Sequence, residues 1–171
     1  SIRDTRTMWL IVGLGNPGNE YEKCRHNTGF ILLNKFACEK DLKWKFSKKF
    51  ESEIAEFGDM VFAKPQTFMN NSGIAVSKLV NFYKISLDDL VVIHDDVDLS
   101  LGVMKKQKGK NAAGHRGVED IIEKLGSKDF WRIRVGVGKP ENSNIPVDRW
   151  VLQDFSDEEF EIISGLSPVQ G

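Results

Sequence analysis

The sequence of 171 residues lacks several features that would indicate a specialised environment. It has two cysteines, Cys24 and Cys38, whose spacing matches neither a metal site nor a disulfide framework, which suits a reducing compartment. No apolar run approaches the roughly 20 residues that a membrane-spanning helix needs. The opening "SIRDTRTM" lacks the long apolar core of a secretory signal. We therefore expect a cytoplasmic protein that does not enter a membrane.

Several familiar catalytic signatures are also missing. No serine lies in a G-x-S-x-G turn, so the sequence does not support a serine hydrolase. Asp95, Asp96 and Asp98 together with histidines form a conceivable set of metal ligands, but no H-x-x-x-H or EF-hand spacing accompanies them. Cys24 lies between two basic residues that could lower the pKa of its thiol, so it stays open as an alternative nucleophile.

Length and composition are those of one globular domain. Hydrophobic residues make up 40% of the chain and charged residues 29%, and no internal repeat, low-complexity tract or interdomain linker interrupts it. We expect residues 9–171 to form a single domain. Residues 1–8 then form an N-terminal extension, in which Met8 is a candidate natural start.

Charge is unevenly distributed along the chain, although the formal net charge is −1. Residues 154–171 hold five acidic residues and no Lys or Arg, so residues 1–153 carry a net positive charge. Lysines cluster at residues 43–49 and again at residues 105–110. Such clusters either bind phosphates or form a solvated surface, so charge alone does not establish a nucleic-acid partner.

Apolar runs alternate with helical patterns, which predicts an α/β fold. We expect strands at Leu10–Gly13, Glu51–Phe57, Met60–Ala63, Leu90–His94 and Ile133–Val137. We expect helices near Asn27–Lys40, Asn70–Tyr83 and His115–Leu125. Because crossover helices must cover a parallel sheet, the prediction is a single domain with a twisted, mostly parallel but mixed β-sheet and helices on both faces.

The stretch "LIVGLGNPGNEYEKCRHNTGF", residues 10–30, contains a G-x-G-x-x-G pattern. A dinucleotide site needs a helix to open directly after this pattern, but Pro17, Gly18 and Asn19 favour a turn at that position. The predicted structure is instead a long loop between strand and helix. This loop carries Asn16 and His26, two polar residues suited to a binding or catalytic site.

Polar residues follow three of the predicted strands, and ligands bind at the carboxyl ends of strands in such sheets. His26 and Asp95 are candidates for a general base and the carboxylate that orients it, with water as the nucleophile. Asn16 and Asn70 would add amides to the same edge.

Each of these polar residues also has a purely structural interpretation. Asn16 could form a turn, and Asn70 could be a helix N-cap. His94, at the end of a strand, is more simply a structural histidine, and His115 could cap or begin a helix.

Four motifs together carry a specific resemblance. The stretches "GLGNPGNEYEKCRHNTGF", "KPQTFMNNSG", "HDDVDLSLG" and "GHRGVEDIIEKLG", the last followed by "RIRVGVG", resemble the successive motifs of the bacterial-type peptidyl-tRNA hydrolase family. The resemblance extends from about Trp9 to Phe155. It implies hydrolysis of the ester between a peptide and the 3′ end of tRNA, without a metal or cofactor, so that the tRNA is reused.

The resemblance also implies roles for the catalytic residues. By motif position, His26 resembles the catalytic base and Asp95 its partner, while Asn16 and Asn70 resemble the amides that bind the scissile region and the terminal nucleotide. An oriented amide N–H can stabilise charge that develops on the ester oxygen.

Further residues match positions that bind the substrate. Tyr21 and Met69 correspond to residues that line the site, and Lys105 and Arg134 to basic residues that hold the tRNA near its 5′ end. The implied partner is therefore peptidyl-tRNA, contacted at its acceptor end and 5′-phosphate region by a monomeric enzyme.

Three departures from the family pattern affect this interpretation. Arg116 occupies a position where the family usually has Asn, and it could bind a phosphate while Asn111 supplies the hydrogen-bond acceptor. Gln107 replaces a common basic residue of the phosphate clamp. The sequence ends soon after "FSDEEFEII", so the terminal helix should be short and leave apolar surface exposed. The alternative function is a noncatalytic RNA-binding protein of the same fold, as in related plant splicing factors.

Overall fold

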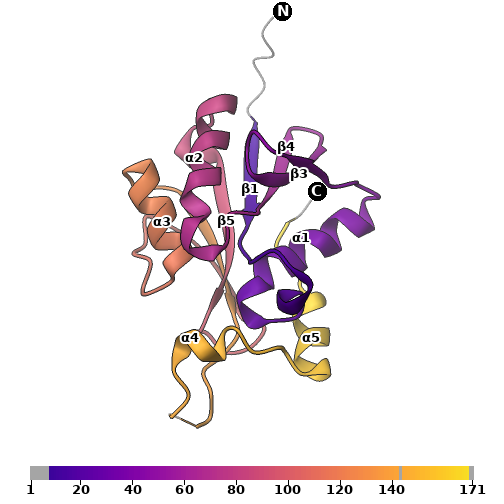
Figure 1. The fold of residues 1–171 in the computed structure, drawn as a ribbon, viewed down its shortest axis with the longest axis vertical. Helices are drawn as coiled ribbons and strands as arrows, with labels where there is room; N and C mark the ends of the chain where they lie inside the picture. The colour runs from indigo at the N-terminus through magenta and orange to yellow at the C-terminus, as the bar shows by residue number, and fades with distance from the viewer. Residues whose placement is uncertain (1–7, 143, 170–171) are drawn as a thin grey trace, which may run out of the picture.

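The computed structural model describes residues 8–142 and 144–169, and most of the expected extension, residues 1–7, lies outside them. Within this part of the chain the backbone forms one seven-stranded sheet (Figure 1). Its strands are β1 (Trp9–Gly13), β2 (Lys45–Ser47), β3 (Ser52–Phe57), β4 (Met60–Pro65), β5 (Leu90–Asp96), β6 (Met104–Lys108) and β7 (Trp131–Gly136). The expected mixed α/β architecture is therefore confirmed.

Helices connect the strands and cover the sheet. The α-helices are α1 (Thr28–Glu39), α2 (Ser72–Tyr83), α3 (Arg116–Leu125), α4 (Val147–Trp150) and α5 (Asp157–Ser164). Short 3₁₀ helices are η1 (Asn19–Tyr21), η2 (Arg25–Asn27), η3 (Met69–Asn71) and η4 (Leu87–Asp89). None of the helices in the described residues combines the length and apolar character that crossing a membrane requires.

The sheet has the strand order β2-β3-β4-β1-β5-β7-β6. Its four central strands, β4, β1, β5 and β7, run parallel, and the flanking strands pair antiparallel with them or with each other. Because the central strands are parallel, their carboxyl ends meet at one edge of the sheet, where loops from distant parts of the sequence lie close together.

Two apolar cores lie on opposite faces of the sheet. Along β1, Leu10 and Val12 pack in the core that α2 and α3 cover, whereas Ile11 faces the core with α1 and α5 (Figure 1). This alternation follows from the two-residue period of a strand. Burial of a leucine or isoleucine side chain contributes about 1.5–3 kcal/mol, so both faces stabilise the positions of the strand ends.

The predicted elements match the observed ones within a few residues, but two strands were not predicted. The strands β2 and β6 are the outer strands of the sheet, and they are short and rich in exposed lysine, for example Lys45 and Lys106. Charged side chains protect a sheet edge from pairing with other chains, and they remove the apolar alternation by which a strand is detected.

Glycines let the first helix begin directly against the sheet. A Cβ at Gly29 would lie 2.3 Å from the backbone N of Leu14 and 2.5 Å from the carbonyl oxygen of Ile93. A Cβ at Gly13 would lie 2.5 Å from the carbonyl oxygen of Gly29. This close approach fixes the start of α1 over the ends of β1 and β5, so the residues just before α1 lie beside the residues that end β5.

We predict that Gly29→Ala destabilises the protein by about 1–3 kcal/mol, the usual cost of overpacking. The thermal midpoint should fall by several degrees, measured by circular dichroism. Gly165→Ala is the control, because the added methyl group would meet no atom closer than 3.3 Å. Equal midpoints for the two variants would contradict the close approach.

Candidate active site

A cavity of about 700 Å³ opens at the carboxyl ends of the central strands. Seven of the ten residues expected to act on or bind the substrate line it: Asn16, Tyr21, His26, Met69, Asn70, Asp95 and Arg116. The opposite wall comes from α4 and the residues after it, including Val147 and Leu152. The structure therefore brings together most of the predicted site.

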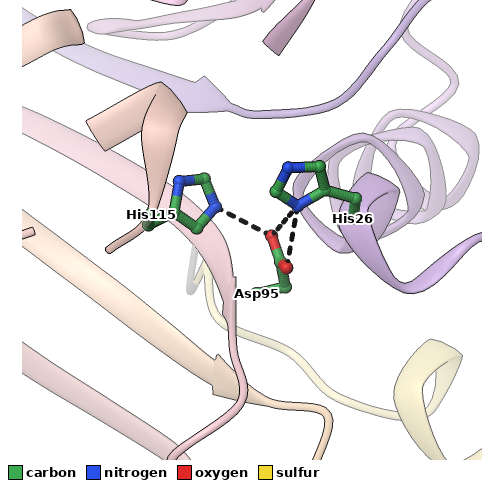
Figure 2. A group of neighbouring side chains, drawn as sticks. All are labelled: His26, Asp95 and His115. Carbon is green, nitrogen blue, oxygen red and sulfur yellow. Dashed lines mark hydrogen bonds and ion pairs between the residues drawn. The ribbon is translucent and has the colours of Figure 1, made fainter. Parts of the chain in front are cut away.

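His26 and Asp95 form a directly bonded pair at this cavity. His26 lies in η2, just before α1, and its Nδ1 is 2.9 Å from Oδ2 and 3.0 Å from Oδ1 of Asp95 at the end of β5. Because the carboxylate accepts, Nδ1 of His26 carries the hydrogen and Nε2 of the neutral ring is left unprotonated. Nε2 points away from Asp95 (Figure 2). This is the arrangement of a base oriented by a carboxylate.

Asp95 has a second imidazole partner, His115, which sequence reasoning treated only as a possible helix residue. Nε2 of His115 is 2.9 Å from Oδ1 of Asp95, on the side opposite His26 (Figure 2). His115 is the N-cap of α3, and its Nδ1 accepts a hydrogen bond from the backbone N–H of Val118. An accepting Nδ1 places the hydrogen on Nε2, so His115 donates to Asp95. The cap prediction is confirmed, but the contact with Asp95 was missed.

His94 is a structural histidine, as its position at a strand end suggested. Its ring is 2% exposed, and Nδ1 donates to the backbone carbonyl of Asp95 over 2.8 Å. Nε2 accepts from Arg132 over 3.3 Å. Burial and the nearby His115 and Arg132 hold the pKa of His94 well below its ordinary value, so this ring is neutral.

Asp95 and His26 shift each other's pKa. Burial disfavours the charged form of His26, but the charge of Asp95 and its hydrogen bonds outweigh burial and raise the pKa of His26 above its ordinary value. Arg116 opposes this increase through its positive charge. Burial also disfavours ionised Asp95, yet His26 and His115 hold the pKa of this carboxyl well below its usual range. Asp95 is therefore ionised at neutral pH.

His26, Asp95 and His115 are also a candidate metal-ligand set, because their ligand atoms lie within 4.8 Å of one another. A metal would need imidazole nitrogens without hydrogens, whereas both nitrogens here donate to the carboxylate. Of the set considered from the sequence, only Asp95 joins these histidines in the described residues, whereas Asp96 pairs with Arg134 and Asp98 with Lys139.

Hydrogen bonds fix both the side chain and the backbone of Asn16. Its Oδ1 accepts from the backbone N–H of Met69 over 2.7 Å, which leaves the amide NH₂ as the end free for a substrate. Its backbone N–H and carbonyl both bond the side chain of Asn27, over 2.8 and 2.9 Å. Asn27 is buried directly after His26, so it joins the loop of Asn16 to the loop of the candidate base. Apart from that adjacency, no pattern in the sequence predicts this role of Asn27.

Asn70 lies exposed at the cavity, in η3 before α2. The structural alternative, that Asn70 is the N-cap of the helix, is wrong because Asn71 occupies the cap position. The preceding Phe68 has φ 66°, a conformation that is unfavourable for a bulky residue. This backbone turn exposes Phe68 at the cavity while Met69 is buried beneath it.

Comparison with known proteins identifies the family. The family model described as "Peptidyl-tRNA hydrolase" matches residues 10–168. The chain belongs to the peptidyl-tRNA hydrolase family. It is 46% identical over 160 residues to the peptidyl-tRNA hydrolase of Mycoplasma capricolum, covering 91% of this chain and 85% of the relative. It is 49% identical over 153 residues to the peptidyl-tRNA hydrolase of Wolbachia pipientis wMel, covering 87% and 82%.

Solved structures support the same assignment. The crystal structure of peptidyl-tRNA hydrolase from Acinetobacter baumannii matches with a TM-score of 0.87 and 32% identity. The match covers 95% of this chain and 85% of the other. The fold and the order of the motifs therefore agree with the peptidyl-tRNA hydrolase family over almost the whole chain.

The two basic residues expected at the tRNA 5′ end lie on neighbouring strands, the outer strand β6 and the adjacent strand β7. Lys105 of β6 pairs in register with Arg134 of β7. Lys105 is exposed, but Arg134 is buried, with Nε 2.7 Å from Oδ2 of Asp96 and Nη1 2.7 Å from Oε1 of Gln107. The lysine cluster at residues 43–49 lies at the opposite edge of the sheet, around β2.

Arg116, which departs from the family pattern, and Asn111, the suggested replacement acceptor, lie apart. Arg116 is exposed at the cavity, with Nη2 3.7 Å from Oδ2 of Asp148 on the opposite wall. Asn111 is exposed and does not line the cavity; its Oδ1 accepts from Lys128 over 3.1 Å. This contact gives no support to Asn111 as a replacement acceptor.

The idea that Cys24 has an activated thiol is wrong. Cys24 is fully buried, and burial raises the pKa of its thiol to about 11. Its Sγ lies 3.6 Å from Oδ1 of Asn27, and the residue does not line the cavity. A protonated, inaccessible thiol cannot act as the nucleophile.

We predict that Arg116→Asn raises the pKa of His26, because it removes a positive charge that disfavours the imidazolium. The chain has three histidines, so the His26 ring can be followed by NMR across a pH titration. Arg149→Asn is the matched control, since Arg149 is exposed on α4 and does not line the cavity. An unchanged or lowered midpoint for His26 in Arg116→Asn would contradict the electrostatic assignment.

Proposed function

We propose that this protein hydrolyses the ester bond that joins a peptide, or an N-blocked amino acid, to the 3′ end of tRNA. The observation that carries the proposal is the His26–Asp95 pair at a cavity of about 700 Å³, in a chain of the peptidyl-tRNA hydrolase family. The reaction frees tRNA from peptides released prematurely during translation. It therefore takes place in the cytoplasm, and a monomer is sufficient for it.

His26 acts as the general base. Its Nε2 removes a proton from a water molecule as the water oxygen attacks the ester carbonyl carbon. The tetrahedral intermediate then expels the 3′ oxygen of the ribose, which takes the proton from His26 and leaves as a hydroxyl. Such base catalysis contributes about 10²- to 10⁴-fold to the rate. Asp95 keeps Nδ1 protonated and stabilises the imidazolium that forms, so no cofactor is needed.

Asn16 and Asn70 bind the scissile region. The fixed Oδ1 of Asn16 leaves its NH₂ as a donor for the ester oxygen, and a preorganised donor of this kind lowers the barrier by about 2.7–4 kcal/mol. Asn70 is exposed at the same cavity, where it can contact the terminal nucleotide. Tyr21 and Met69 also line the cavity, where they can contact the acyl group or the ribose.

Exposed cations bind the phosphates of the tRNA. Within residues 8–142 and 144–169, the ion pair of Arg116 at the cavity is a 3.7 Å contact with the exposed Asp148, so its guanidinium is available for a phosphate near the 3′ end. Lys105 and Arg134 serve the 5′-phosphate region, with Lys105 as the exposed point charge. The buried Arg134 is already paired with Asp96, so its contribution is to shape this surface.

We predict that His26→Asn abolishes release of N-acetylaminoacyl groups from tRNA, with kcat at least about 10²-fold lower. Asparagine retains a polar side chain, so tRNA binding and the thermal midpoint should stay close to those of the parent. The measurement is release of the labelled N-acetylaminoacyl group, combined with tRNA binding by filter retention.

Two outcomes would oppose the proposal. Full turnover by a folded His26→Asn variant would exclude His26 as the base. No turnover by a folded parent that binds tRNA would exclude the hydrolase and favour a noncatalytic RNA-binding role.

We predict that Lys105→Ala weakens tRNA binding and lowers the slope of log affinity against log salt by about one. The kcat at saturating substrate should change little, because the residue does not line the cavity. Lys45→Ala is the matched control, an exposed lysine on the outer strand at the opposite edge. Equal salt slopes for the two variants would place the phosphate contact elsewhere.

A further inference from the structure

Backbone hydrogen bonds join the residues around His26 to the segment that follows α4. The backbone N–H of His26 donates to the carbonyl of Val151 over 2.7 Å, and that of Arg25 donates to Gln153 over 3.1 Å. In return Phe155 donates its backbone N–H to Lys23 over 2.8 Å. These bonds join the loop of the candidate base to residues more than a hundred positions later, so the position of this segment determines where the base lies.

The side chain of Arg25 adds further bonds between the residues around His26 and the segment after α4. Arg25 is 5% exposed, and its Nη1 donates to the carbonyls of Trp150 and Gln153 over 3.4 and 3.3 Å. Nη2 is 3.1 Å from Oε1 of Glu159 at the start of α5. The guanidinium carbon lies 3.5 Å from the ring centroid of Trp150, so the planar group stacks on the indole. One side chain therefore joins η2, the end of α4 and α5.

Stability alone does not explain a buried guanidinium at this place. Replacing a buried ion pair with apolar side chains is often neutral or stabilising, because desolvation offsets the Coulomb gain. Nε of Arg25 also lacks a hydrogen-bond partner, unlike the other buried side-chain nitrogens and oxygens in the described residues. An unpaired buried donor costs about 1–3 kcal/mol. A buried residue that carries this cost is a candidate for a functional role.

The contacts of Arg25 with Trp150, Gln153 and Glu159 also determine the position of one cavity wall. Val147 and Asp148 of α4, and Val151 and Leu152 after it, line the cavity together with Asn16 and Asn70. Trp150, on which Arg25 stacks, ends α4 and donates its Nε1–H to the carbonyl of Gly138 over 2.9 Å. The wall that contacts the substrate and the backbone that carries His26 are thus fixed relative to one another through one guanidinium.

We propose that Arg25 is a positioning residue for the hydrolysis, which fixes the backbone of His26 against the α4 wall so that the imidazole meets the ester in a productive geometry. The inference rests on the proposed role of His26 as the base. Lysine cannot replace Arg25, because an ammonium group neither donates to two carbonyls and a carboxylate in one plane nor stacks flat on an indole. A displacement of the base by about 1 Å is enough to reduce the rate about 10²-fold.

The test is Arg25→Lys, with Arg149→Lys as the matched control, because Arg149 is an exposed arginine in α4. Steady-state hydrolysis of N-acetylaminoacyl-tRNA is measured well below the thermal midpoint of each variant. We expect kcat to fall at least about tenfold in Arg25→Lys while KM stays within about threefold. Arg149→Lys should match the parent.

The pH profile separates positioning from a general loss of stability. If His26 moves away from Asp95, it loses the interactions that raise its pKa, so the low-pH limb of kcat should move to lower pH. Because lysine keeps the positive charge, this shift cannot come from a lost charge. A role in stability alone would lower the thermal midpoint and leave kcat and the limb unchanged in the folded variant.

A second variant covers the case in which Arg25→Lys does not fold. Glu159→Gln removes the carboxylate charge that pairs with Arg25 but keeps an oxygen that can accept from the backbone N–H of Ser156. We expect its kcat to fall about threefold, by the same loss of orientation. The inference would be overturned if Arg25→Lys and Glu159→Gln, whichever of them fold, keep kcat within about twofold of the parent. His26→Asn is assayed in parallel, so that failure of the base assignment is distinguished from failure of the role of Arg25.

Discussion

The buried carboxylate of Asp95 is the interaction on which the site depends. Its side chain is 2% exposed, and an unpaired carboxylate at that depth would cost several kcal/mol. His26 and His115 donate to its oxygens, and His94 donates to its backbone carbonyl. All three histidines of the chain therefore converge on one residue. Because the carboxylate must be satisfied, the loops that carry these rings cannot move apart without loss of stability.

The parallel centre of the sheet makes this convergence possible. The strands β1 and β5 are neighbours, so the loop after β1 and the end of β5 meet at one edge. The close packing at Gly29 brings the start of α1 onto the same edge, with His26 three residues earlier. The glycine-rich pattern after β1 thus serves a long loop whose shape is set by Asn27 and Arg25. Only the single-turn 3₁₀ helix η1 follows Gly18 directly, and the first α-helix, α1, begins at Thr28.

The sequence predicts the parts of this site that leave a local signal. Apolar runs and helical periodicity identify the central strands and the three long helices, and the polar residues after them identify His26, Asp95 and Asn16. The contacts of His115, Asn27 and Arg25 leave no such signal. Each depends on a partner far along the chain, for example Arg25 on Glu159, and each residue type has an ordinary local interpretation. Only the tertiary structure determines which interpretation holds.

The same distinction applies to the cations that a tRNA would meet. The family resemblance assigns both Lys105 and Arg134 to the tRNA 5′ region, with Lys105 as a point charge and Arg134 as a bidentate donor to phosphate. In the structure Arg134 is neutralised by Asp96 and is oriented by Gln107, the residue that departs from the family pattern. Arg116, the other departure, is exposed with one long ion pair. A paired, buried guanidinium has already exchanged its water for protein partners, so it gains little from a phosphate, whereas an exposed cation keeps that gain available. Of the phosphate contacts proposed above, those of Lys105 and Arg116 should therefore contribute more to tRNA affinity than that of Arg134.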